Sequence, residues 1–394
     1  MLPAKPKLTR RLLSACISLI LICIYLLTAA SPTPYVGDLS PSPHVAGGFP
    51  RKIWQTWKVH PLEFEKREME CARSWSSKNP GHRYEVLTDQ NDLYYLETHF
   101  GPKGLNRPDI IYVYRSLTAT IIKADLLRYL VMYVEGGAYA DIDVEALRPL
   151  SNFIPDRFNE QEIDMIIGVE IDQPEFKNHS VLGPKSQSFC QWTFVCKPRL
   201  PVMLKLVDNI IRWLNQLAKA QNVPISRITL DFDDVISGTG PSAFTGAILE
   251  DMSYRTGKKV TWDTFHNMAE SKVVGGILVL TVEAFAAGQG HSNSGSHNAR
   301  TALVKHHFHA SGWPNNHRRY MHPMFGEVER CNWNAACVAE WDRKRAEFDA
   351  LPLEEQAKRI AVKQFADAFN NPVPKQNAVP NSNPKPIPKP NQNP

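Results

Sequence analysis

Residues 123–143 read KADLLRYLVMYVEGGAYADID, and this stretch decides the predicted fold. Apolar side chains from just before this stretch to its middle recur at the spacing of one helix face: Ile121, Ile122, Leu126, Tyr129, Leu130, Tyr133 and Val134. Gly136 and Gly137 follow, and glycine commonly ends a helix because it adopts left-handed backbone without steric cost. Residues 138–144 then read as a short strand bearing Asp141 and Asp143. A long helix that leads directly into a strand predicts an α/β sheet.

The same alternation continues on both sides of this stretch. Before it we predict strands at 52–57 and 84–87 with a helix at 62–76 between them. After it we predict a buried strand at 163–171, an amphipathic helix at 200–220, and late strands at 276–282 and 302–308. Short apolar runs that alternate with helical patterns favour one α/β domain, which we place at residues 51–370.

The two aspartates could share one cation. In an extended strand, residues two apart point the same way, so both carboxylates can face one hard divalent ion. Such an ion neutralises a diphosphate and stabilises it as a leaving group. The alternative is a pair of solvated acids at the end of a strand, and the pattern alone favours that alternative. Asp125 and Arg128 lie three residues apart and share one helix face. They could form an ordinary ion pair within the helix, or they could bind a ligand.

The N-terminal part predicts a membrane anchor. Residues 12–30 carry no charge and, at about 1.5 Å per residue, span a hydrocarbon core of roughly 30 Å. Lysines and arginines precede them and none occurs in 31–50, so residues 1–11 should be cytosolic and the rest lumenal. A cleaved signal peptide is the alternative. Residues 31–50 read as a proline-rich stem, and 371–394 as a disordered Pro/Asn-rich tail.

Composition and cysteines narrow the class of protein. The 394 residues are 43% hydrophobic with a net charge of +5, which is too small for a nucleic-acid footprint. A lumen permits disulfides, and the simplest bridges pair Cys190 with Cys196 and Cys331 with Cys337, leaving Cys71 over.

Five motifs together resemble one enzyme family. They are residues 123–143, FPRKIWQTWK at 49–58, FCQWT at 189–193, TGP at 239–241 and VKHHF at 304–308. In their order along the chain they resemble glycosyltransferase family 32, which implies a GT-A-type (Rossmann-like) nucleotide-sugar-binding domain with a mixed central sheet and a retaining reaction. The resemblance spans residues 49–313 and is closest to the fungal initiation-specific α-1,6-mannosyltransferases. It implies transfer of mannose from GDP-mannose to an N-glycan in the Golgi, by a single-pass type II membrane protein.

The resemblance also assigns residues. It makes Asp141, Asp143 and Arg128 catalytic, and it makes Asp141 and Asp143 ligands of Mn²⁺ together with a late histidine. That histidine is His306, with His307 as the alternative and His309 close enough to compete. The donor-binding set is Gln55, Trp57, Asp125, Arg128, Tyr133, Gly137 and Asp141, and the acceptor-side set is Gln191, Gly240 and Pro241.

Two other functions remain open from the sequence. A family member of this kind could instead mannosylate inositol-phosphoceramide, although such relatives carry further apolar spans after the catalytic domain. The chain could also be a catalytically silent subunit of a Golgi mannosyltransferase complex. For the enzyme, we expect same-face transfer in which the donor phosphate helps to deprotonate the acceptor hydroxyl.

Overall fold

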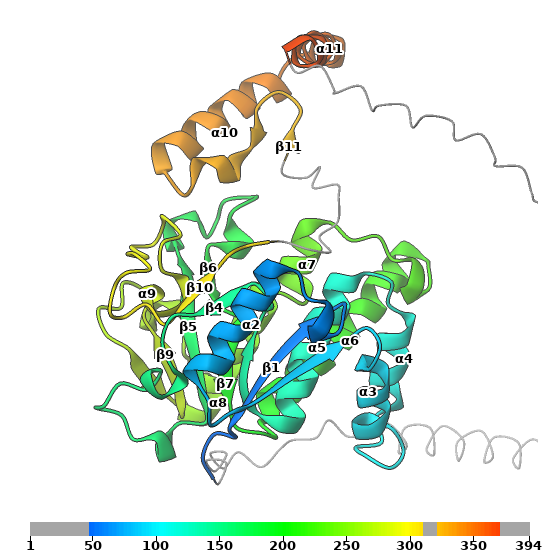
Figure 1. Ribbon diagram of the computed structural model, residues 1–394. Coiled ribbons are helices and arrows are strands. Elements are labelled where there is room, and N and C mark those ends of the chain that lie inside the picture. Colours follow the sequence, from blue (N-terminus) through cyan, green and yellow to red (C-terminus); the bar gives the residue numbers. More distant parts are fainter. Residues whose placement is uncertain (1–46, 310–320, 371–394) are drawn as a thin grey trace, which may run out of the picture.

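The computed structural model describes residues 47–309 and 321–370, and Figure 1 shows its central sheet with helices around it. The predicted cytosolic tail, membrane span and C-terminal tail lie outside the described residues, as does most of the predicted stem. Among the helices that the structure describes, none combines the length and the apolar character that a bilayer crossing requires.

The sheet is mixed, as the resemblance implies. Its strand order is β2-β1-β3-β7-β5-β9-β8, with β6 paired to β5. Strand β1 pairs in parallel with β2 and β3, whereas β7 runs antiparallel to both β3 and β5. The strands are β1 (Lys52–Trp57), β2 (Arg83–Thr88), β3 (Gly137–Ala140), β4 (Val144–Ala146), β5 (Met165–Asp172), β6 (Gln187–Phe189), β7 (Thr193–Cys196), β8 (Lys272–Val274), β9 (Ile277–Leu280), β10 (Val304–His306), β11 (Met321–His322) and β12 (Gly326–Glu327).

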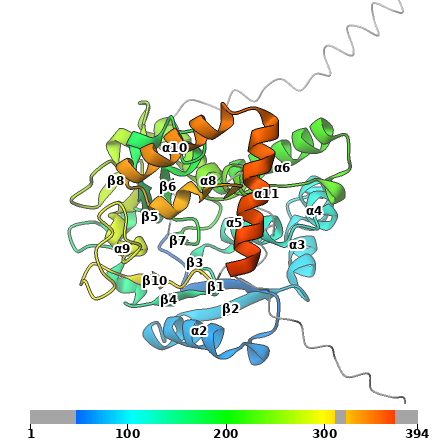
Figure 2. The same ribbon diagram turned by 90° about the horizontal axis from the view of Figure 1, so that it is seen from above.

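Helices cover both faces of this sheet, and the last two helices of the described chain lie apart from it, at the top of Figure 1. The helices are α2 (Lys66–Lys78), α3 (Asp92–Phe100), α4 (Pro108–Ser116), α5 (Thr120–Glu135), α6 (Pro201–Gln221), α7 (Phe232–Gly238), α8 (Pro241–Thr256), α9 (Val282–Ala286), α10 (Ala335–Asp349) and α11 (Leu353–Asn370). Figure 2 shows α2 and α5 on opposite sides of β1. Side chains alternate accordingly, because Tyr139 of β3 packs in the core beneath α5 while Ala138 and Ala140 join the core on the α2 side.

Most predicted elements are confirmed with shifted ends. The first two strands are β1 and β2, the long helix is α5, the strand at 163–171 is β5, and the helix at 200–220 is α6. The helix at 62–76 is a 3-10 turn at Pro61–Glu63 followed by α2. The late strands are shorter than predicted, since β9 ends at Leu280 before α9, and β10 holds only three residues.

One predicted strand is wrong in a way that matters for the site. Residues 138–144 are not a single strand, because β3 ends at Ala140 and Asp141–Asp143 form a turn before β4. Strand β4 leaves the main sheet and pairs antiparallel with β10, Val144 opposite His306. The turn therefore lies where the chain passes from one sheet to another.

The double glycine is confirmed as the end of α5. Gly136 and Gly137 have φ of +61° and +93°, in the left-handed region that disfavours other residues. A β-carbon at Gly137 would lie 2.5 Å from the carbonyl oxygen of Lys52, and one at Gly136 would lie 2.6 Å from the nitrogen of Pro198. The first contact leaves no room for a side chain between the start of β3 and β1, and the second leaves none between Gly136 and the segment after β7.

The cysteine prediction is half correct. Cys331 and Cys337 form a disulfide, but Cys190 and Cys196 are buried free thiols, and so is Cys71. Cys196 lies opposite Met165 of β5, whereas the Cys190 N–H donates to the carbonyl of Gly168, three residues or about 10 Å further along the same extended strand. Disulfides need Cα atoms roughly 4.4 to 6.8 Å apart, so the extended chain excludes this bridge.

Candidate metal centre

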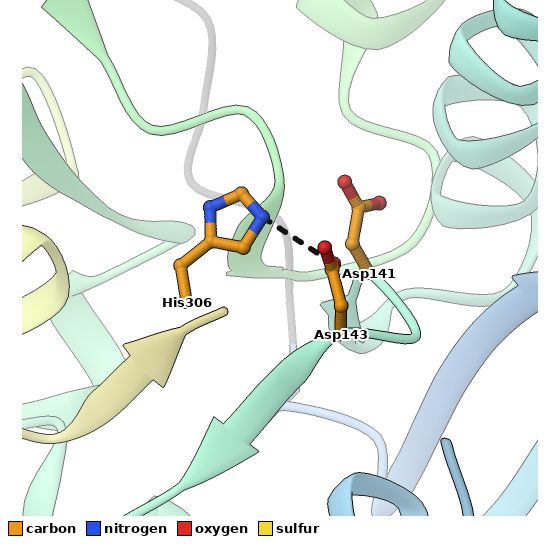
Figure 3. Close-up of side chains that lie close together, drawn as sticks. All are labelled: Asp141, Asp143 and His306. Atoms are coloured by element: carbon orange, nitrogen blue, oxygen red, sulfur yellow. Dashed lines mark ion pairs between the residues drawn. The ribbon is translucent and has the colours of Figure 1, made fainter. Parts of the chain in front are cut away.

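Three candidate ligands meet where β3 ends. Asp141 and Asp143 come from the turn after β3, and His306 comes from the last residue of β10 (Figure 3). One ligand atom from each of the three lies within 4.8 Å of the others, and His306 Nε2 is 3.3 Å from an Asp143 carboxylate oxygen. The pairing of β4 with β10 is what brings His306 opposite the turn, across more than 160 residues of chain.

The turn is fixed through its backbone. The Asp141 N–H donates to the carbonyl of Trp192 at 2.8 Å, and the Asp141 carbonyl accepts from the Val144 N–H at 3.0 Å. The same carbonyl accepts from Gln55 Nε2 at 2.9 Å, while the Gln55 side-chain oxygen accepts from the Tyr84 hydroxyl. Gln55, predicted to bind the donor, is fully buried and supports the backbone of Asp141.

Arg128 balances the charge on the buried side of the site. Its Nη2 lies 3.1 Å from Asp125 Oδ1 and 3.1 Å from Asp141 Oδ1, with the guanidinium over the Tyr139 ring. The Tyr139 hydroxyl donates to Asp141 Oδ1 at 2.7 Å. The structure thus brings the predicted pair of Asp125 and Arg128 to Asp141, but with only 2% and 5% of these residues exposed.

The two aspartates of the turn have opposite pKa shifts. Burial raises the pKa of Asp141, although the charge of Arg128 opposes the shift. Burial also acts to raise the pKa of Asp143, but the hydrogen bond and charge of His306 and the His309 N–H outweigh it, and the pKa falls to about 2. Asp143 is therefore ionised throughout the physiological range, ready to hold a cation.

A buried network connects this site to the predicted acceptor side. Thr239 Oγ1 donates to Asp125 Oδ2 at 2.6 Å, and the Gln191 side-chain oxygen accepts from Arg128 and from the Tyr129 hydroxyl. Thr239 is followed by the N-cap of α8 at Gly240 and by its first residue, Pro241. Gln191, Gly240 and Pro241 thus adjoin the network around Arg128, and their acceptor-side role stays a prediction.

The remaining donor-side residues lie apart from the three ligands. Trp57 ends β1, half-buried, with Lys58 Nζ 5.2 Å from its ring centroid. Tyr133 lies in the last turn of α5 beneath the guanidinium of Arg199, and Gly137 begins β3 at the end opposite Asp141. The structure does not bring Tyr133 or Gly137 to the ligand group, and no contact supports their predicted role.

The structure distinguishes the three late histidines. His307 points away from the aspartates, with Nε2 at 3.0 Å from Glu145, because neighbouring strand residues face opposite sides. His309 contributes its backbone N–H, which donates to Asp143 Oδ2 at 2.8 Å. Only the imidazole of His306, among the described histidines, joins the aspartate pair.

Residues 65–162, which hold both aspartates, match a family described as "Glycosyltransferase sugar-binding region containing DXD motif". This segment belongs to that glycosyltransferase family. The resemblance predicted from the sequence motifs is therefore confirmed, and the aspartates of the turn are the DXD motif of the glycosyltransferase segment.

Matches to individual relatives cover more of the chain than the family match does. A protein of Schizosaccharomyces pombe named "Initiation-specific alpha-1,6-mannosyltransferase" is 30% identical over 67% of this chain and 63% of its own length. A Candida albicans protein of the same name is 28% identical over 67% of this chain and 72% of that protein. The match thus spans less than two thirds of the first relative. A solved structure titled "PaToxG Glycosyltransferase" is 15% identical, covers 52% of this chain and 70% of that chain, and has a TM-score of 0.35.

The ligand set of the glycosyltransferase segment fits a divalent cation. Two carboxylates and one imidazole supply oxygen and nitrogen ligands for the cation. Carboxylate oxygens suit Mg²⁺ and Mn²⁺, and imidazole is also an acceptable ligand of Mn²⁺. Arg128 pairs with Asp141, whereas Asp143 lies beside the imidazole of His306. When bound, such an ion would neutralise the negative charge of a diphosphate.

Two residues near the glycosyltransferase ligands were missed by sequence reasoning. Glu170 lies in the predicted buried strand, and an acid within an apolar run was its only signal. Trp192 lies in the FCQWT motif at 189–193 but was assigned no role in the site. In the structure, Trp192 Nε1 donates to Glu170 Oε1 at 2.8 Å, and its ring centroid lies 4.5 Å from that of His306.

Proposed function

We propose that this protein is a GT-A-type retaining glycosyltransferase that moves mannose from GDP-mannose to an N-glycan, in α-1,6 linkage. The observation that carries the proposal is the convergence of Asp141, Asp143 and His306 at the end of β3, within a DXD-family segment. The names of the two fungal relatives support the choice of mannose and of the linkage. Mn²⁺ is the proposed cofactor, on the chemistry of the two carboxylates and the imidazole.

The residues of the site would then have separate roles in binding the cation and in positioning its ligands. Asp143, with its low pKa, and Asp141 offer carboxylates to the cation, and His306 offers Nε2. Arg128 holds Asp141 in place and offsets its charge, and Tyr139 fixes the same carboxylate by a hydrogen bond. A cation at this site would favour departure of the donor diphosphate, and the acceptor would attack on the same face of the sugar.

The proposed setting is the Golgi lumen. The uncharged run at residues 12–30 and the basic residues before it support a type II membrane anchor there. A Golgi mannosyltransferase complex is the corresponding proposal for partners.

Donor transfer by the purified full-length protein tests this function. In detergent, with Mn²⁺ and a high-mannose glycan, we expect mannose transfer from GDP-mannose and from no other nucleotide sugar in a panel. Asp143→Asn should abolish transfer. Glu145→Gln is the matched control, because Glu145 is the next acid in the chain and pairs with His307 instead of the ligand group. Full activity of Asp143→Asn would refute the metal-site assignment.

The same assay separates the other two readings. Transfer of mannose to inositol-phosphoceramide but not to the glycan would be consistent with the proposed cation site and would refute the proposed acceptor. A protein that neither transfers mannose nor hydrolyses GDP-mannose in the presence of Mn²⁺ would be a silent subunit. Linkage analysis of the glycan product checks the α-1,6 position.

A further inference from the structure

The imidazole of His306 lies between two aromatic side chains. Its ring centroid is 4.5 Å from that of Trp192 and 3.9 Å from that of Phe308, the latter nearly stacked at 29°. Its Nε2 faces Asp143, whereas Nδ1 is buried and has no hydrogen-bond partner among the residues that the structure describes. In most protein metal sites a hydrogen bond at the second ring nitrogen fixes the imidazole. Here the aromatic neighbours take that place.

One of these neighbours is itself held by a buried acid. Glu170 of β5 is 8% exposed, and its Oε1 accepts from Trp192 Nε1 at 2.8 Å. Its other oxygen lies 3.5 Å from Ser188 Oγ. The indole is 3% exposed, so it has no room for another orientation in the packed core.

We propose that Glu170, acting through Trp192, is a positioning residue that sets the orientation of His306 as a cation ligand. Glu170 fixes the indole by its hydrogen bond, and the indole and Phe308 hold the imidazole with Nε2 toward the aspartates. This inference rests on the proposed function, because it takes Asp141, Asp143 and His306 as the cation site. It adds a role for a buried acid that lies outside the group of three candidate ligands.

Direct measurement of Mn²⁺ affinity tests the proposal without any need for turnover. The free Mn²⁺ signal in electron paramagnetic resonance, titrated with full-length protein, gives the dissociation constant. Glu170→Ala should weaken binding about 10-fold, the low end of the effect of losing a support behind a metal ligand. Glu170→Gln keeps an oxygen that accepts from the indole, and it should bind Mn²⁺ within about threefold of the wild type, on the same scale.

The same strand supplies a matched control. Asp172, two residues after Glu170, accepts from the indole Nε1 of Trp262 at 2.7 Å, and also from His266 and the Asn267 N–H. No ring contact joins Trp262 to His306 among the described residues. Asp172→Ala should therefore lower the melting temperature and leave the Mn²⁺ dissociation constant unchanged.

A second variant keeps the test decisive if Glu170→Ala folds poorly. Phe308 is the other aromatic side chain beside His306, and it is 54% exposed. Phe308→Leu therefore removes this ring without opening the core. We expect it to weaken Mn²⁺ binding about fivefold, part of the effect of losing a support behind a ligand. Unchanged affinity in Glu170→Ala and Phe308→Leu, or an equal loss in Glu170→Gln and Glu170→Ala, would overturn the positioning role. Absence of Mn²⁺ binding by the wild type would instead overturn the proposed metal site.

Discussion

Replacement of Arg128 by methionine tests the charge balance beneath the candidate site. The guanidinium lies 3.1 Å from both Asp125 and Asp141 and is 5% exposed, and methionine fills much of its volume without the charge. The variant leaves the buried carboxylate of Asp125 and the partly buried carboxylate of Asp141 without the charge that pairs with them. Breaking a buried ion pair from one side costs about 3–5 kcal/mol in unfolding free energy. At roughly 2 °C per kcal/mol for a domain of this size, the melting temperature should fall by about 6–10 °C.

The effect should depend on the metal. Arg128 and a bound divalent cation both act on Asp141, so removing the arginine should tighten binding of Mn²⁺ while it abolishes transfer. A ligand at 100 times its dissociation constant stabilises a protein by about 2.7 kcal/mol. At a fixed Mn²⁺ concentration, the rise in melting temperature over an EDTA sample should therefore be larger for Arg128→Met than for the wild type.

Arg255 provides the control for this experiment. Its side chain is also buried and pairs with Asp164 at 2.9 Å and Asp251 at 2.6 Å, on α8 and away from the three ligands. Arg255→Met should be destabilised as well, but its response to Mn²⁺ should equal that of the wild type. The reasoning fails if Arg128→Met melts within about 2 °C of the wild type in EDTA, a loss of roughly 1 kcal/mol. It also fails if the Mn²⁺ response of Arg128→Met is no larger than that of Arg255→Met.

Three further predictions follow from single contacts. Asp143→Asn should lose the Mn²⁺-dependent rise in melting temperature while His307→Ala retains it, and equal losses in calorimetry would contradict the choice of ligands. Burial raises the pKa of Glu170, so ionisation of this carboxyl above that pKa lowers the free energy of unfolding of the wild type. Glu170→Gln should therefore have a higher melting temperature than the wild type at pH 7.5 in EDTA, and this difference should vanish as the pH falls through the raised pKa. Peptide mapping under non-reducing conditions should find Cys190 and Cys196 as free thiols, and a bridge between them would disprove the described β7.

Strong local patterns explain why much of the fold could be predicted. The apolar stripe of α5 and the two glycines after it specify a helix, its end and a following strand through the chemistry of adjacent residues alone. The same holds for β1, whose pattern of apolar and β-favouring residues is continuous. Helices α3, α4 and α7 to α11 were not predicted; α3, α4, α7 and α9 are short, and α8 and α10 lack a clear apolar stripe.

The candidate site was predicted only in part, for a related reason. Asp141 and Asp143 were expected to face one way because both would lie in one strand, but they share a site because a turn between two sheets brings them together. The choice of His306 over His307 depends on the pairing of β10 with β4, which joins residues far apart in the sequence. Periodicity along one segment contains no information about such pairing.

The sequence by itself determined the α/β class, the glycine-ended helix before the DXD motif and the family resemblance, because these depend on residue types at short, fixed spacing. Only the tertiary structure decided which histidine meets the aspartates, that Arg128 is enclosed between Asp125 and Asp141, and that Glu170 supports the indole beside His306. Each of these is a contact between segments that the chain order separates, and packing and strand register in the folded protein fix such contacts.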